Sequence, residues 1–196
     1  MVKEERPTRS EALELLKSYN KSDNLIAHAL AVEGVMLHFA ELLGEEDKEK
    51  WGIIGLIHDI DYEMYPEEHC KKARDILTEH NYPEEYIRAV QSHGWEICVD
   101  VEPIETMEKV LYTIDELTGL ISATALMRPS KSVLDLKTRS VKKKWKQKSF
   151  AAGVNREVIR KGAEMLEMDL DKIIEETIKG MQNVAEEIGL KGNIDL

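Results

Sequence analysis

The sequence contains an ordered series of histidines and aspartates of the kind that holds a divalent metal ion. In chain order these residues are His28, His58, Asp59, His69, His93 and Asp115. Imidazoles and carboxylates bind catalytic divalent metals in proteins, and water can fill any open position. The adjacent pair His58 and Asp59 follows the apolar run 52–57. Because two titratable side chains at the end of a buried run need a partner, we expect a metal ion beside them.

Helical spacing indicates which of these side chains point inward. His28 shares a predicted helical face with Leu25, Val32 and Val35 and should therefore face the core. A buried histidine satisfied by hydrogen bonds is the alternative for His28. The other members of the series favour a metal ligand.

Asp115 lies one turn from Leu111 and one turn from Gly119, on an apolar stripe. A carboxylate there is costly unless it is paired or binds a cation. The alternative, an exposed acid on the same helix, suits the neighbouring Glu116 better.

His69 shares a predicted face with Ala73 and Ile76, and His93 ends an inward stripe just before Gly94. Each can be a ligand of a second metal, a phosphate contact or a satisfied core histidine.

The elements that must position these residues are helices, because helical periodicity dominates and strand alternation is nowhere convincing. The predicted helices cover about residues 8–19, 22–44, 45–58, two segments that begin at Pro66 and Pro83 and stop near Asn81 and Gly94, then 104–126, 155–168 and 169–188. We therefore expect an all-α protein of one domain, residues 1–196. A metal-binding core would span residues 22–126, and a C-terminal helical extension residues 127–196.

Composition narrows the functional classes. Charged residues make up 33% of the 196 residues and the formal net charge is -11, which favours a soluble chain and argues against general nucleic-acid binding. We expect neither a secretory signal after Met1 nor a segment with the roughly 20 apolar residues of a transmembrane helix. Cys70 and Cys98 make neither a recognisable metal spacing nor a disulfide framework. We expect a protein of the reducing cytoplasm.

The ordered series, with its central His58-Asp59 pair, resembles the HD superfamily of metal-dependent phosphohydrolases over about residues 24–119. The resemblance implies an HD-type helical bundle. The ligands that it implies for the primary metal are His28, His58, Asp59 and Asp115. In members with two metals, the aspartate matching Asp59 bridges the two ions, and the histidines matching His69 and His93 hold the second.

The resemblance also implies a reaction, the hydrolysis of a nucleotide or another small phosphoester. The metal would lower the pKa of its bound water towards about 7 and neutralise phosphate charge. One or two ions of Mn²⁺, Fe²⁺, Co²⁺, Ni²⁺ or Zn²⁺ suit such mixed ligands.

The residues after His58-Asp59 depart from well-known branches of the superfamily. Where one variant reads HDIG, often followed by Lys, this chain has Asp61 and Tyr62. There is no Gly-Tyr-Pro triplet of the kind found in cyclic-dinucleotide phosphodiesterases, which argues against that substrate. Nucleotidase and alarmone-hydrolase branches place a catalytic acid at the position of Tyr62. Asp59 and Asp61 are the catalytic candidates, with Glu63 a further proton-transfer candidate; Asp61 and Glu63 are alternatively exposed acids of a loop.

A basic run spans residues 137–148 without an intervening acid. It is either a solvated helix face that offsets an acidic protein or a funnel that attracts an anionic substrate. In the second case Lys142, Lys143 and Lys144 would contact substrate, and Trp145 could stack a base.

Two other functions stay open. The same order of residues resembles the di-iron oxygenases of the superfamily. Redox-active iron and oxygen consumption would distinguish such an oxygenase from a phosphohydrolase. A non-catalytic helical module that retains a metal is the third interpretation. The expected partner is a small phosphorylated molecule, and a homo-oligomer is left open.

Overall fold

The computed structural model describes residues 6–194, and the regular secondary structure in that range is helical apart from an isolated bridge between Trp95 and Val99. The elements are α1 (Arg9–Tyr19), α2 (Asp23–Leu42), α3 (Lys48–Ile57), the short 3-10 helix η1 (Pro66–Glu68), α4 (Lys71–Glu79), α5 (Glu84–Ser92), α6 (Thr106–Leu126), α7 (Thr138–Trp145), α8 (Arg156–Met165) and α9 (Leu170–Asn183). The predicted all-α fold class is confirmed.

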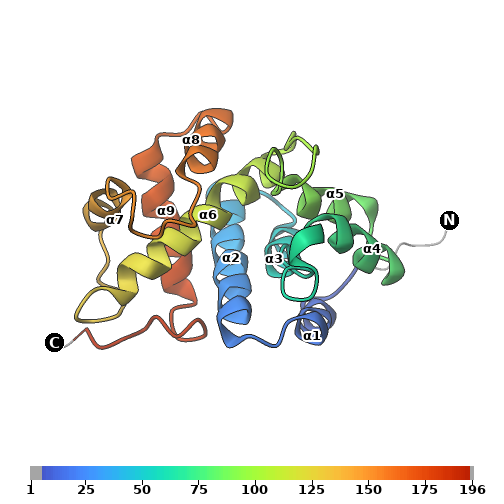
Figure 1. Cartoon of the computed structure of the whole chain (residues 1–196), viewed down its shortest axis with the longest axis horizontal. Coiled ribbons are helices and arrows are strands. Elements are labelled where there is room, and N and C mark those ends of the chain that lie inside the picture. Colours follow the sequence, from blue (N-terminus) through green and yellow to red (C-terminus); the bar gives the residue numbers. More distant parts are fainter. Residues whose placement is uncertain (1–5, 195–196) are drawn as a thin grey trace.

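Helix α2 lies at the centre of the molecule (Figure 1). It packs against α3 on one side and α9 on the other, and α6 runs across it. Two glycines allow α2 and α9 to meet closely. A Cβ atom on Gly180 would lie 2.7 Å from the Cα atom of Val35, and one on Gly34 would lie 3.2 Å from the carbonyl oxygen of Gly180. A side chain at either position would therefore push the two backbones apart.

The expectation that no segment approaches a transmembrane helix in length and apolar composition was wrong. By length and composition alone, α2 is long and apolar enough to cross a membrane. It has 20 residues, its most apolar 18-residue window has a mean hydropathy of 1.5, and half of that window is buried inside the protein. It also carries the buried Glu33, whose Oε2 accepts a hydrogen bond from Arg9 of α1 at 2.9 Å. The central position of α2 accounts for its apolar composition.

Helix α3 carries the chain to the His58-Asp59 pair. Asp47 caps its first turn by accepting a hydrogen bond from the backbone N–H of Lys50. Residues 51–57 are all buried, because α3 packs against α1, α2 and α5. The helix ends at Ile57, so His58 and Asp59 leave it at its buried end.

Helix α1 begins with a capping box, in which Thr8 and Glu11 are bonded reciprocally. The helix predicted to begin at Pro66 is divided into two helices in the structure. Pro66 opens only the short helix η1, and α4 begins at Lys71 because Cys70 has a left-handed backbone with φ of 63°. His69 therefore lies outside the helix that carries Ala73 and Ile76.

The remaining boundaries differ by a few residues. Pro83 occupies the N-cap of α5 rather than its first turn. Asn155 and Asp169 cap α8 and α9, which agrees with the predicted starts of these helices, but α9 ends at Asn183 rather than near Ile188.

The C-terminal helices return to the core. Helix α8 packs against α6 and helix α9 against α2, so that α7, α8 and α9 gather on one side of α2 while α1, α3, α4 and α5 lie on the other (Figure 1). Arg156 fixes the connection between α7 and α8 by donating hydrogen bonds to the carbonyl oxygens of Trp145 at 2.9 Å and Phe150 at 2.7 Å. This connection reaches the site described below.

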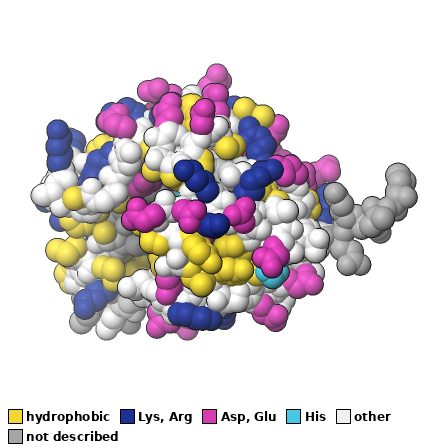
Figure 2. Space-filling view, turned by 45° about the vertical axis from the view of Figure 1, so that its right-hand side comes forward, with side chains coloured by type: hydrophobic (Ala, Val, Ile, Leu, Met, Phe, Trp, Pro, Cys, Tyr) yellow, Lys and Arg dark blue, Asp and Glu magenta, His cyan; other side chains and the backbone are white. Residues whose placement is uncertain are grey.

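The surface carries both signs of charge. On the face in Figure 2, acidic and basic side chains are interspersed around a group of exposed hydrophobic side chains. Acidic side chains therefore do not cover this face uniformly, although the formal net charge of the protein is -11.

Candidate metal centre

Four side chains from separate parts of the sequence converge beside the buried end of α3. His28 comes from α2, His58 and Asp59 follow α3, and Asp115 comes from α6. One ligand atom of each lies within 4.8 Å of all the others. The Nε2 atom of His58 is 3.3 Å from both Asp59 Oδ2 and Asp115 Oδ1, and His28 Nε2 is 2.9 Å from Asp115 Oδ1. This is a group that can hold a metal ion.

The surroundings of the His58 imidazole show whether a metal ion fits this group of residues. Its Nδ1 atom lies 2.8 Å from the carbonyl oxygen of Gly55 and must donate to it, which leaves Nε2 directed at the two carboxylates. Nε2 is buried and has no hydrogen-bond partner. A buried polar atom without a partner is costly, and a cation at this point would bind its lone pair together with the two carboxylates. The donor set therefore fits a divalent metal.

The electrostatics of the site favour a cation. Burial lowers the pKa of His58, but the carboxylates of Asp59 and Asp115 outweigh it and hold the pKa well above its usual value. Burial likewise raises the pKa of both aspartates, and the neighbouring His58 more than reverses this, so that both values lie well below normal. Both carboxylates are therefore ionised at neutral pH, and the negative potential that raises the pKa of His58 would also attract a metal ion, which would take the place of the proton on Nε2.

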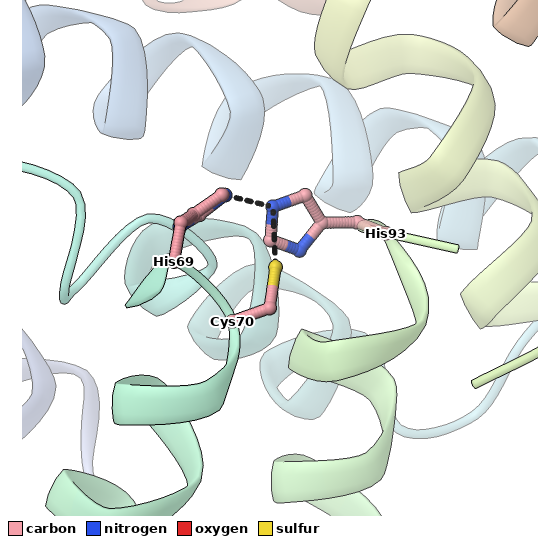
Figure 3. A group of neighbouring side chains, drawn as sticks. All are labelled: His69, Cys70 and His93. Carbon is pink, nitrogen blue, oxygen red and sulfur yellow. Dashed lines mark hydrogen bonds between the residues drawn. The ribbon is translucent and has the colours of Figure 1, made fainter. Parts of the chain in front are cut away.

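A second cluster lies on the other side of Asp59. The Oδ1 atom of Asp59 is 3.4 Å from the Nε2 atoms of His69 and His93. Those two nitrogen atoms are 3.2 Å apart, and Cys70 lies beside them (Figure 3). Asp59 thus directs one carboxylate oxygen towards each cluster. The six residues of the ordered series are all brought together.

Buried partners orient the second pair of histidines. The Nδ1 atom of His93 bonds to the carbonyl oxygen of Val90 one turn earlier. The Nδ1 atom of His69 donates to Asp61 Oδ1 at 2.8 Å, and the other oxygen of Asp61 accepts the backbone N–H of Ala73 at 2.7 Å. Asp61 is fully buried, which corrects the interpretation of an exposed loop acid. Both carboxylate oxygens are engaged, so Asp61 positions His69.

The neighbours of Asp61 behave differently. Tyr62 is 45% exposed, and its ring lies edge-on to His69 with the ring centroids 5.1 Å apart. Glu63 is exposed, as one interpretation of the sequence held, and accepts the backbone N–H groups of Lys21 and Ser22. Glu63 therefore serves the entry to α2 and does not face the metal cluster.

A cavity of about 370 Å³ opens onto the two clusters. Besides the candidate ligands, its wall includes Tyr62, Ile97, Glu116, Gly119, Gly153 and Val154. Gly153 and Val154 come from the connection between α7 and α8, which Glu116 holds by accepting the backbone N–H of Asn155 at 3.0 Å. The C-terminal extension therefore contributes to the wall of the site, and no sequence motif had indicated this contribution.

The basic run does not line this cavity. Lys142 pairs with Asp171 at 2.5 Å, Lys143 is exposed, and Lys144 lies over the ring of Phe150 at 4.6 Å from its centroid. Lys137 instead borders a separate cavity of about 630 Å³ between α7 and α9. Direct contact between Lys142–Lys144 and a substrate at the metal cluster has no support in this geometry.

The histidines outside the series have other surroundings. His80 is exposed at the end of α4. The Nε2 atom of His38 lies 2.6 Å from Glu176 of α9 and so links α2 to the extension. Neither contributes a ligand atom to the two clusters.

The comparison with protein families matches the HD domain to residues 25–124. The matched segment contains all six residues of the ordered series and ends within α6. The comparison with solved structures finds no match.

Proposed function

Because the chain belongs to the HD-domain family, we propose that it is a metal-dependent phosphohydrolase that cleaves a nucleotide or another small phosphoester. The observation that carries the proposal is the buried Nε2 atom of His58, which has no hydrogen-bond partner and faces the carboxylates of Asp59 and Asp115. Such an arrangement is stabilised by a divalent cation.

His28, His58, Asp59 and Asp115 would hold the primary ion, and His69, His93 and Asp59 would hold a second. When bound, such ions supply an acidified water as the nucleophile and neutralise the charge of the phosphate. Mixed imidazole and carboxylate ligands suit Mn²⁺, Fe²⁺, Co²⁺, Ni²⁺ or Zn²⁺.

The protein's own residues do the remaining work. Asp59 and Asp115 stay ionised and so keep the negative potential that retains cations. Asp61 holds the ring of His69 in place by accepting a hydrogen bond from the Nδ1 atom of His69. We therefore assign Asp61 a positioning role in place of proton transfer. The cavity of about 370 Å³ lies in the size range of small-molecule sites and admits a small phosphoester.

A second candidate is a di-iron oxygenase, because Asp59 faces both clusters and so suits a pair of redox-active ions. A non-catalytic module that binds a metal and a ligand is the third. We keep a cytoplasmic location and a small phosphorylated partner as part of the leading proposal.

The testing experiment screens metal-free protein against nucleotides, cyclic nucleotides and sugar phosphates, with each of the five metals added back. We expect phosphate or nucleoside release with at least one metal and loss of that release in Asp115→Asn. His80→Ala, which changes an exposed histidine, should retain full activity. Bound metal without hydrolysis of any substrate would contradict the proposal, and oxygen consumption by the iron form would then support the oxygenase.

A further inference from the structure

Cys70 lies within the second cluster, although its position in the sequence gave no metal spacing. Its Sγ atom is 3.8 Å from His93 Nε2, and one ligand atom each of His69, Cys70 and His93 lie within 4.8 Å of one another. Figure 3 shows the sulfur of Cys70 directed at the same ring nitrogen of His93 that faces His69. The three donor atoms thus converge on one small space.

The backbone holds the sulfur in this position. Cys70 has φ of 63°, a left-handed conformation that is uncommon for a residue with a side chain. The conformation interrupts the chain between η1 and α4 and turns a fully buried side chain inward. Backbone strain of this kind concentrates at functional sites, where the surrounding structure must compensate for it.

Gly94 makes room for the sulfur. A Cβ atom at this position would lie 2.5 Å from Cys70 Sγ and 2.5 Å from Cys98 Sγ. The two sulfur atoms are 3.3 Å apart, and Cys98 also lines the cavity in front of the clusters. A residue without a side chain, directly after His93, therefore lets two thiols approach the histidine pair.

We propose that Cys70 is an additional protein ligand, beside His69, His93 and Asp59, for an ion in the second cluster. Binding replaces the thiol proton, which passes to solvent, and leaves a thiolate–metal bond. The inference rests on the second ion of the proposed function and does not depend on which bond the enzyme cleaves. Cys98 contacts the Cys70 sulfur as a neighbour.

A thiolate changes which metals the second cluster prefers. Soft sulfur ligands favour Zn²⁺ and Co²⁺ over Mn²⁺ and Mg²⁺, whereas the primary cluster offers only nitrogen and oxygen. The Cys70→Ser variant should therefore lose Zn²⁺ affinity at the second cluster by at least about tenfold, with a smaller change for Mn²⁺.

The test is a Co²⁺ titration of the reduced, metal-free, full-length protein, followed by absorption spectroscopy. Wild type should bind two ions and develop a sulfur-to-cobalt charge-transfer band in the near ultraviolet. Cys70→Ser should lose the band but still bind the first ion, which also shows that it folds. The matched variant Cys98→Ser should keep the band.

Three results would overturn the proposal. These are two bound Co²⁺ ions without the band, a band that survives in Cys70→Ser, or a band lost only in Cys98→Ser. X-ray absorption of the wild-type Zn²⁺ form provides a check without variants, because a sulfur ligand at about 2.3 Å is expected. These readouts are independent of hydrolysis, so a failed activity screen would leave them unaffected.

Discussion

The buried carboxylate of Asp61 accepts a hydrogen bond from Nδ1 of His69 at 2.8 Å. This contact sets the direction of Nε2 on the other side of the imidazole ring, which faces Asp59 and His93. Asp61, which is not itself one of the proposed metal ligands, thereby controls the geometry of the second cluster.

Asp61→Ala should weaken the second cluster selectively. Loss of the partner that orients a metal-binding histidine typically reduces metal affinity about 10–100-fold. We expect a drop of that size for the second ion in calorimetric titration and little change for the first. Glu67→Ala, an exposed acid in the same segment, is the control. Equal weakening of both ions in Asp61→Ala would indicate general unfolding and contradict a positioning role.

Gly94→Ala should destabilise the protein. The added methyl group would overlap both sulfur atoms, and overpacking of this kind typically costs about 1–3 kcal/mol. Denaturant unfolding monitored by circular dichroism measures the change. Gly153→Ala is the matched control, because a Cβ atom there meets nothing within 4 Å. Equal stability of the two variants would show that the space beside the thiols is not restricted.

Glu176 should make the attachment of α9 to α2 dependent on pH. Burial raises the pKa of Glu176, but hydrogen bonds from Lys172, His38 and Lys179 reverse this and lower it to about 2. A carboxyl with a depressed pKa in the folded state stabilises the protein above its unfolded pKa of about 4.3. That stabilisation is lost as pH falls towards the folded value of about 2.

The Glu176→Gln variant isolates this contribution. It should be less stable than wild type at pH 7, and the difference in unfolding free energy should shrink between about pH 4.3 and pH 2. Urea unfolding at several pH values measures it. A difference that stays constant across that range would exclude the ionised form of Glu176 as its source.

Neutralising the basic run should leave catalysis largely unchanged. Lys142 is paired with Asp171, and none of Lys142, Lys143 and Lys144 lines the cavity at the metal cluster. The triple alanine variant should therefore keep the wild-type KM at low and at moderate salt. An increased KM with a weaker salt dependence would restore the interpretation of an electrostatic funnel.

The features that sequence reasoning predicted best depend on local periodicity. His58 and Asp59 follow an apolar helix whose residues 51–57 are all buried, so their inward position follows from the helix itself. His28 and Asp115 could be placed because each shares a helical face with apolar neighbours.

The features that were missed depend on contacts distant in sequence. Asp61 is buried because it reaches the N–H of Ala73, which nothing in the loop sequence indicates. Cys70 approaches His93 only because its backbone is left-handed, a conformation that sequence patterns rarely reveal for a cysteine. The adjacency of His69 and Cys70 was the one available signal. Gly153 and Val154 reach the site through the packing of α8 on α6.

The most direct test of the central claim is metal analysis of purified protein together with the His28→Ala and Asp115→Asn variants. We predict that wild type holds tightly bound divalent metal, that both variants lose the primary ion while their circular dichroism remains helical, and that His80→Ala binds as wild type does. Full metal occupancy in both variants would contradict the account, because His28 and Asp115 would then not be ligands of the metal.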